Sequence, residues 1–323
     1  MKVLVVTQSE NTAVAPVIEA LRQRGAEVFR FDTDQYPVAS RLSVWQGASG
    51  PRSVLESNGY TLELGELGAI WFETVDAAYQ LPAMAADVQA VIRRESAAVL
   101  DGLGATLDAF QLDPVPNRDA AYSKLRQHRL AVEAGLELPR TLVTNDAAAV
   151  RRFFRECPQG LITKMHKKFV RIYGVDSEQV TTSPVTEEDL DSLDGLELCP
   201  MIFQESIPKK RELRVTIVGH QIFSAEVDSQ ALPATRDSWH NDQSANIWRP
   251  CELPERVGAR LLDLLTRMGM NYSACDLIRT PDDRYVFLEL NARGRWGFIE
   301  DATGLPISQA IADLLVGRAP RRV

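Results

Sequence analysis

The sequence contains no apolar run long enough to cross a membrane, because charges or glycines interrupt its longest apolar stretches. The apolar start, Val3–Val6, is also too short for the core of a signal peptide. Only four cysteines and four histidines occur in 323 residues. Neither a C-x-x-C pair nor an H-E-x-x-H motif is present, which argues against zinc sites of those types and against a disulfide scaffold. We therefore expect a cytoplasmic enzyme or binding protein.

An excess of positive charge is also missing. Lys and Arg number 36 against 44 Asp and Glu, and the net charge of −8 argues against general nucleic-acid binding. The G-x-G-x-x-G fingerprint of dinucleotide-binding folds does not follow the first apolar segment. What is present is the balance of a globular protein, with 45% hydrophobic and 25% charged residues. A chain of this length exceeds the usual size of one hydrophobic core, so two or three domains are expected.

The order of the expected elements divides the chain into three parts. It begins with a strand, a helix and a strand, at 3–6, 14–21 and 27–31. This βαβ unit requires a parallel sheet. Two prolines within Asp113–Asn117 prevent a continuing helix and mark a boundary. Helix-favouring segments follow at 118–134, 146–157 and 183–196, and strands dominate from 201. The sequence thus predicts an α/β part and then an α+β part, with domains at 1–113, 114–200 and 201–323.

The segment NYSACDLIRTPDDRYVFLELNARGRW, at 271–296, carries the most specific chemical signal. It predicts two antiparallel strands joined by a turn at 281–283. Glu289 and Asn291 share one face of the second strand by parity, and Asp276 lies on the partner strand. Two carboxylates and an amide oxygen suit Mg²⁺, which is completed by water and substrate phosphates. The alternative is an ordinary hairpin with exposed acids, but a carboxylate inside the apolar run VFLEL requires a partner or a metal.

Three further patterns suit a nucleotide. Lys164 ends the apolar strand LITK, where an ammonium suits a phosphate, and Lys124 lies in a helical segment. Both lysines can equally be solvated surface residues. The segment 204–207 ends a strand before a proline turn, where backbone groups suit an adenine edge. Glu212 and Arg214 share a strand face, as a structural salt bridge or as a site where the arginine meets a transferring phosphoryl group.

Taken in order, these segments resemble the ATP-grasp ligases. The resemblance rests on Lys124, Lys164, QESI at 204–207, E-L-R at 212–214, and D-L-I-R followed by F-L-E-L-N, and it spans the whole chain. The ending N-A-R-G-R-W is similar to the N-x-x-G-x-W of the peptide-modifying branch, the graspetide macrocyclases of the microviridin and plesiocin type. The resemblance implies an ATP-grasp fold with an N-terminal Rossmann-like (pre-ATP-grasp) domain, a central domain and a C-terminal domain, with ATP between the last two.

The resemblance also implies roles for single residues. Contacts with ATP are implied for Lys124, Lys164, Gln204, Glu205, Ser206, Ile207 and Glu212. Among these, the lysines would meet the phosphates, the 204–207 segment the adenine, and Glu212 the ribose. Two Mg²⁺ ions would be bound by Asp276, Glu289 and Asn291. Catalytic roles are implied for Arg214, Arg236 and Arg293, and contacts with the acyl substrate for Arg293 and Arg295.

The implied reaction is an ATP-dependent ligation that forms ADP and phosphate. An Asp or Glu side chain of a ribosomally made precursor peptide becomes an acyl-phosphate, and a Thr or Ser hydroxyl or a Lys amine condenses with it to close a macrocycle. ATP and Mg²⁺ are the implied cofactors, the leader and core of the peptide are the partners, and relatives suggest a homodimer. Two alternatives stay open: a ligase that adds an amino acid to a peptide or small acid, and a catalytically silent nucleotide-binding partner.

Three other segments carry expectations about access and recognition. The loop Met165–Val175 is the candidate lid that keeps water from the acyl-phosphate. The helix near Glu187–Leu196 is the expected docking site of the leader. At Trp71–Thr74 the chain has Trp-Phe-Glu-Thr, where microviridin-type enzymes carry tryptophan, tyrosine and two arginines. This departure leaves the mode of leader recognition open.

Overall fold

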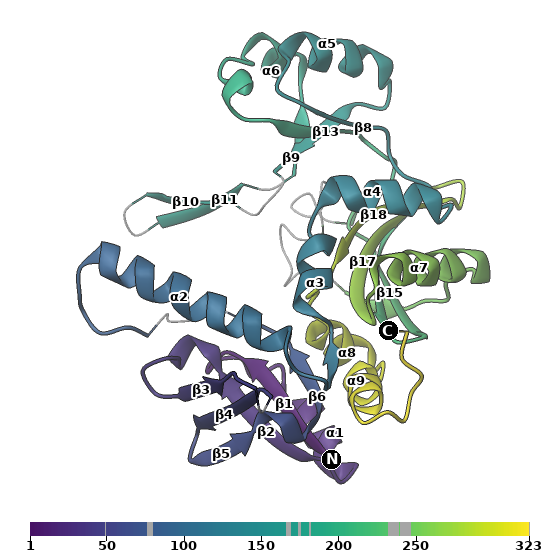
Figure 1. The fold of residues 1–323 in the computed structure, drawn as a ribbon. Helices are drawn as coiled ribbons and strands as arrows, with labels where there is room; N and C mark the ends of the chain where they lie inside the picture. The colour runs from purple at the N-terminus through teal and green to yellow at the C-terminus, as the bar shows by residue number, and fades with distance from the viewer. Residues whose placement is uncertain are drawn as a thin grey trace.

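The computed structural model of the chain describes residues 1–48, 50–75, 80–165, 169–173, 176–180, 182–231, 239 and 247–322 (Figure 1). A four-stranded parallel sheet lies at the N-terminal end. The four-stranded and five-stranded sheets that follow it along the chain are antiparallel. The predicted change from an α/β to an α+β arrangement is therefore confirmed. No helix in the described ranges is both long and apolar enough to span a membrane.

The N-terminal part is built on a four-stranded parallel sheet with the order β2-β1-β6-β7. Its strands are β1 (Lys2–Thr7), β2 (Glu27–Asp32), β6 (Leu67–Phe72) and β7 (Phe110–Leu112), and its helices are α1 (Ala15–Gln23) and α2 (Ala86–Gly104). The strands run parallel because crossovers, not tight turns, connect them. The strand order reverses direction between β1 and β6, and open α/β sheets bind ligands outside the carboxyl ends of strands at such a point.

A small antiparallel sheet is inserted between β2 and β6. It contains β3 (Arg41–Trp45), β4 (Arg52–Ser57) and β5 (Tyr60–Glu63), with short 3₁₀ turns at Thr33–Gln35 and Leu64–Glu66 before and after it. Asn58 and Gly59 form the two-residue turn between β4 and β5 and have φ angles of 48° and 78°. This conformation matches the twist of a tight hairpin. The hairpin predicted within 44–64 thus has a third strand.

The helix predicted at 118–134 is two helices, α3 (Val115–Ala121) and α4 (Lys124–Glu133). The break falls at Ser123, whose side-chain oxygen accepts a hydrogen bond from the backbone N–H of Arg126 at 3.4 Å. A serine with extended backbone is a favourable cap, and it starts a new helix inside a sequence that favours helix on both sides. The break places Lys124 in the first turn of α4.

The central part holds the antiparallel sheet β12-β9-β13-β8. Its elements are β8 (Thr141–Thr144), α5 (Ala147–Glu156), β9 (Leu161–Lys164), β12 (Ser183–Val185), α6 (Glu187–Asp191) and β13 (Met201–Glu205). A hairpin of β10 (Phe169–Tyr173) and β11 (Asp176–Val180) projects from this sheet (Figure 1). β13 pairs with both β8 and β9, so this strand belongs to the central sheet.

The acidic stretch at 183–196 is only partly helical. Its helix is α6, which has five residues and begins with a capping box between Thr186 and Asp189. The stretch begins with β12, and a 3₁₀ turn follows at Leu196–Leu198. Of the docking helix predicted near Glu187–Leu196, only the first five residues are helical, because the helix ends at Asp191 with Ser192 as its C-cap.

The C-terminal part is a five-stranded antiparallel sheet with the order β16-β15-β14-β17-β18. Its elements are β14 (Arg211–Val218), β15 (Gln221–Val227), β16 (Arg249–Pro250), α7 (Glu255–Met268), β17 (Tyr272–Arg279), β18 (Tyr285–Asn291), α8 (Gly297–Thr303) and α9 (Ile307–Leu315). One face packs on α7 and α4 through residues such as Leu213 and Leu265. The other face, with Val218, shares a core with α9 and the N-terminal strands. Alternation along β14 places Arg214 on this second face.

Candidate active site

Three neighbouring strands place candidate catalytic and metal-binding residues side by side. Arg214 on β14 lies opposite Asp276 on β17, and Asp276 lies opposite Glu289 on β18. The Nη1 of Arg214 donates to both carboxylate oxygens of Asp276, at 2.9 and 3.0 Å. Arg214 and Asp276 are each 4% exposed, so this ion pair is almost completely removed from water. Strand parity predicted that the two carboxylates would meet, and the structure brings them together.

Two further side chains close this cluster. The Asn291 Nδ2 donates to Asp276 Oδ2 at 2.9 Å and to Glu289 Oε1 at 3.3 Å. The Lys124 ammonium forms an ion pair with Glu289. Burial alone would raise the pKa of Glu289, but the charges of Lys124 and Lys164 outweigh it and hold that pKa well below its usual range. The carboxylate inside the run VFLEL is therefore ionised and paired with lysine.

The donor chemistry of this cluster fits Mg²⁺. Asp276 and Glu289 offer carboxylate oxygens from adjacent strands, and Asn291 adds an amide whose oxygen and nitrogen exchange places by rotation of the group. Hard oxygen ligands of this kind are those that Mg²⁺ prefers. Because Lys124 and Lys164 hold the pKa of Glu289 low, this carboxylate is in the ionised form that a divalent ion requires.

Lys164, the last residue of β9, is held by a chain of polar side chains. Its ammonium donates to Gln204 Oε1 at 2.9 Å, and Gln204 Nε2 donates to Thr141 Oγ1 at 2.9 Å. Burial lowers the pKa of Lys164 to about 8, although Glu289 acts in the opposite direction. The negative charge of a bound phosphate would raise the pKa of this ammonium and keep it protonated. The side chain of Gln204 therefore positions the lysine, and the sequence patterns did not foresee that task.

His128 is a residue of this cluster that the sequence patterns did not single out. It lies four positions after Lys124 on α4, and this spacing puts both on one face of the helix. Burial, together with the charges of Lys164 and Lys124, lowers the pKa of His128 to about 4. The imidazole is thus neutral at physiological pH and lies beside the charged pair. The spacing from Lys124 was the signal available in the sequence.

The segment expected to meet adenine already uses part of its backbone. The N–H of Glu205 donates to the carbonyl of Arg140 at 2.9 Å, and the N–H of Ser206 donates to that of Gly160 at 3.0 Å. The adenine contact that the resemblance implies would therefore require other backbone groups of the 204–207 segment, such as those of Ile207.

Glu212 is buried in β14, and its Oε1 accepts from two donors. These are the Lys209 ammonium at 3.2 Å and the backbone N–H of Trp239 at 3.3 Å. The salt bridge that was expected with Arg214 is not the one formed, because Arg214 turns to Asp276 instead. Glu212 is an anchored carboxylate, as its implied contact with a ribose requires.

The remaining predicted arginines lie at the edge of the cluster. Arg293 is exposed, and its Nε donates to the Tyr122 hydroxyl at 2.7 Å. The side chain of Arg295 is exposed too, while its backbone carbonyl accepts from Arg214 Nη2 at 3.4 Å. Arg236 lies outside the described residues. So do positions 166–168 and 174–175 of the predicted lid, whose described part contains β10.

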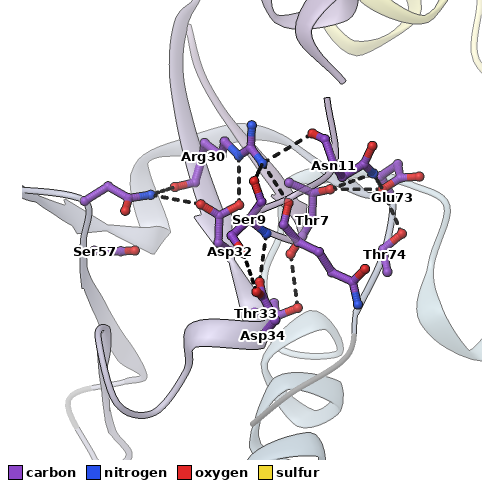
Figure 2. Close-up of polar contacts among 12 residues, drawn as sticks. Thr7, Ser9, Asn11, Arg30, Asp32, Thr33, Asp34, Ser57, Glu73 and Thr74 are labelled. Carbon is purple, nitrogen blue, oxygen red and sulfur yellow. Dashed lines mark hydrogen bonds and ion pairs between the residues drawn. The ribbon is translucent and has the colours of Figure 1, made fainter. Parts of the chain in front are cut away.

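A second polar cluster lies at the carboxyl ends of β1 and β6 (Figure 2). Glu73 Oε2 accepts from the Thr7 hydroxyl at 3.0 Å, from the Thr74 hydroxyl at 2.7 Å and from the Asn11 amide. This cluster occupies the point at which the strand order reverses. Glu73 stands where microviridin-type enzymes carry an arginine. The departure noted at 71–74 therefore replaces a positively charged residue type with an acidic one at the carboxyl end of β6.

Comparisons with known proteins agree with this architecture. The N-terminal part matches the family model of the MvdD pre-ATP-grasp domain over residues 2–119. Macrocyclase MdnC from Microcystis aeruginosa MRC, solved with precursor peptide MdnA, is 39% identical at a TM-score of 0.88, covering 98% of this chain and 100% of MdnC. Macrocyclase MdnB from the same organism is 34% identical at 0.82, covering 98% and 99%. No curated protein matches the chain.

A third structure is more similar in shape. The RiPP-associated ATP-grasp ligase of Chryseobacterium gregarium, in complex with ADP and a leader and core peptide, has a TM-score of 0.93. It is 32% identical, and the match covers 99% of this chain and 98% of that ligase. The fold is thus an ATP-grasp fold with a pre-ATP-grasp domain, which defines an ADP-forming ligase. The chain belongs to the ATP-grasp macrocyclases that mature ribosomally made peptides, the graspetide maturases.

Proposed function

We propose that this ATP-dependent peptide ligase activates Asp or Glu side chains of a precursor peptide and condenses them with Thr or Ser hydroxyls or Lys amines to form macrocycles. The buried arrangement of Arg214, Asp276 and Glu289 carries the proposal, because it gathers two carboxyl side chains beside an arginine. The full-length similarity to MdnC, a macrocyclase solved with its precursor peptide, supports a peptide substrate. The leader and core peptide on the Chryseobacterium ligase supports the same conclusion.

ATP and Mg²⁺ are the cofactors of this ligase. Bound Mg²⁺ would bridge and neutralise the ATP phosphates, and Asp276, Glu289 and Asn291 would hold the ions, two in number by the family pattern. Lys124 and Lys164 lie at the same cluster and suit the phosphates. The Arg214 guanidinium, fixed by Asp276, suits the charge of the moving phosphoryl group.

The proposed chemistry has two steps. A carboxylate oxygen of the peptide attacks the γ-phosphorus, the bond from that phosphorus to the bridging oxygen of ADP breaks, and an acyl-phosphate forms. A hydroxyl oxygen or amine nitrogen then attacks the acyl carbon, loses its proton, and expels phosphate as the carbon–oxygen bond breaks. The carboxylate is already a competent nucleophile, so the protein supplies position and charge neutralisation.

Intact-mass spectrometry tests this function directly. A precursor peptide encoded beside the gene is incubated with the protein, ATP and Mg²⁺, and ADP is measured in parallel. Loss of one water per bond, with ADP formed, is the expected result. A mass gain that matches an added amino acid would contradict macrocyclisation and favour the amino-acid-adding ligase.

Two variants sharpen this experiment. Asp276→Asn removes a carboxylate of the cluster and should abolish both ADP formation and the loss of water. Arg94→Gln, on α2, removes a side chain that is 74% exposed and should leave both unchanged. Full activity of Asp276→Asn would refute the metal assignment while leaving the identity of the product untouched.

We also propose that the protein is a homodimer. Val88, Val91 and Val99 are exposed and lie on one face of α2, because these spacings return to the same side of a helix. An apolar face of this kind favours association with a second copy. Light scattering after gel filtration should give twice the monomer mass, and Val91→Glu should halve it; a monomeric wild-type chain would refute the proposal.

A further inference from the structure

A cavity of about 20 Å³ lies where the N-terminal sheet meets the C-terminal part. Its walls come from the carboxyl end of β6 (Trp71–Glu73), from Arg118 of α3, and from the loop Ala292–Gly294 after β18. A void of this size has room for about one water-sized group, such as an oxygen of a carboxylate. It also lies beside the point of strand-order reversal, where open α/β sheets bind ligands.

Arg118 presents an unused donor to this cavity. The residue is 4% exposed, and its Nη1 donates to the carbonyl of Phe72 at 2.9 Å. Its Nε–H is buried without a hydrogen-bond partner in the described part of the chain, and Asp119 Oδ1 lies 3.9 Å away, too far for a hydrogen bond. A buried donor left unpaired is destabilising, and the Nε side of a guanidinium matches a carboxylate in geometry.

Two arginines, Arg118 and Arg293, lie on the cavity wall. Burial lowers the pKa of Arg118 and the positive charge of Arg293 adds to this effect, while Asp119, Tyr122 and Asp101 act in the opposite direction. The two acids on the wall have other partners. Asp113 accepts from the backbone N–H groups of Asn271 and Tyr272 at 2.8 and 2.9 Å.

Glu73, the second acid, already accepts hydrogen bonds from three side chains. Its Oε2 accepts from Thr7, Asn11 and Thr74 (Figure 2), and its charge acts on Tyr272, whose pKa it helps burial to raise. The Arg118 Nε–H, which has no hydrogen-bond partner in the described residues, is therefore the group on the cavity wall that an anion would satisfy.

The cavity adjoins the arginine expected to act in phosphoryl transfer. Gly294 forms part of its wall, and a Cβ added to Gly294 would lie 2.6 Å from Arg214 Nη2. Trp71 and Trp296 line it as well, with ring centroids 5.5 Å apart, and offer apolar surface to the methylene groups of an acidic side chain. A carboxylate held here lies next to the phosphoryl-transfer cluster.

We infer that this cavity is the binding site for the side-chain carboxylate that the enzyme activates, with Arg118 as the principal donor and Arg293 as a second cation at the rim. The inference rests on the proposed function for its substrate class, an acidic peptide side chain. It assigns a binding role to Arg118, for which no sequence motif provided one.

Binding of two matched probes to the full-length protein tests the inference. N-acetylglutamate α-N-methylamide carries the side-chain carboxylate, and N-acetylglutamine N-methylamide is its neutral counterpart. Tryptophan fluorescence reports occupancy, since Trp71 and Trp296 line the cavity. We expect the wild-type protein to prefer the acid, and Arg118→Gln to weaken binding of the acid about 10- to 100-fold while leaving the amide unchanged. The exposed Arg94→Gln should behave as wild type.

Each outcome has one meaning. Equal binding of acid and amide to the wild-type protein, or an undiminished preference in a folded Arg118→Gln variant, overturns the inference. If Arg118→Gln fails to unfold cooperatively or to bind ADP, Arg293→Gln on the exposed rim decides, and full retention of the preference overturns the inference. The probes need neither ATP turnover nor a precursor peptide. Absence of condensation with an intact acid preference would therefore refute only the proposed function.

Discussion

Substitution of Gly294 by alanine should displace Arg214 and so lower both the stability and the turnover of the protein. The added Cβ would lie 2.3 Å from the Ala274 Cβ and 2.6 Å from Arg214 Nη2, whereas carbon atoms in contact are about 3.5–4.0 Å apart. Ala274 lies on the inner strand β17, which is paired on both sides and has little room to move, so Arg214 must shift. Overpacking of this kind lowers the free energy of unfolding by about 1–3 kcal/mol. Displacement of a donor from a developing charge lowers turnover by about 100- to 1,000-fold.

Gly297 provides the matched control. It lies three positions further on, in the first turn of α8, and a Cβ added there meets no atom within 4 Å. Urea unfolding followed by tryptophan fluorescence gives the free energy of unfolding, and ADP formation with a precursor peptide gives turnover. Gly297→Ala should keep the wild-type turnover and be at least as stable as the wild type, because alanine favours a helix over glycine. A Gly294→Ala variant with wild-type stability and turnover would show that the close approach to Arg214 has no mechanical consequence.

Three further perturbations follow from the same cluster and its supports. Glu289→Gln removes one of the two carboxylates of the cluster and should abolish ADP formation at every Mg²⁺ concentration of a titration. Activity restored at high Mg²⁺ would show that Glu289 is not an essential ligand. Lys164→Met should weaken ATP binding about 10- to 100-fold in a nucleotide titration, whereas the exposed Lys210→Met should not, and equal affinities would remove Lys164 from the phosphate site. Burial raises the pKa of Asp113 from 3.8 to about 7, so between these values the folded chain keeps a proton that the unfolded chain has released. The free energy of unfolding should therefore fall as pH rises from about 4 to 7, by up to about 4 kcal/mol, in urea titrations. Asp113→Asn should remove this slope, and an identical slope in both proteins would contradict the assignment.

Much of the carboxylate cluster of Asp276, Glu289 and Asn291 could be predicted from the sequence because it depends on local geometry. Residue parity along β18 determines that Glu289 and Asn291 share a face, and a short turn makes β17 its antiparallel partner. A carboxylate inside an apolar run signalled a buried partner, and Lys124 is that partner. The parallel N-terminal sheet followed in the same way from the alternation of short strands and helices.

The predicted helices at 118–134 and 183–196 were wrong in their extent, because one local contact interrupts each pattern that favours helix. Ser123 caps α4 and divides a sequence that favours a continuous helix. β12 pairs with β9 and shortens the acidic helix that follows it to five residues. A single cap or strand pair contributes little to a periodicity, so such breaks are not visible in composition or spacing.

The amino-acid sequence by itself determined which residue types carry the chemistry and in which order they occur, since strand parity and apolar runs are local properties. Tertiary structure alone decided that Arg214 pairs with Asp276 rather than Glu212, and that Gln204 positions Lys164. It also created the cavity at Arg118, whose walls come from segments more than 200 positions apart in the chain. Contacts between such distant segments depend on how whole sheets pack, and no local pattern records that packing.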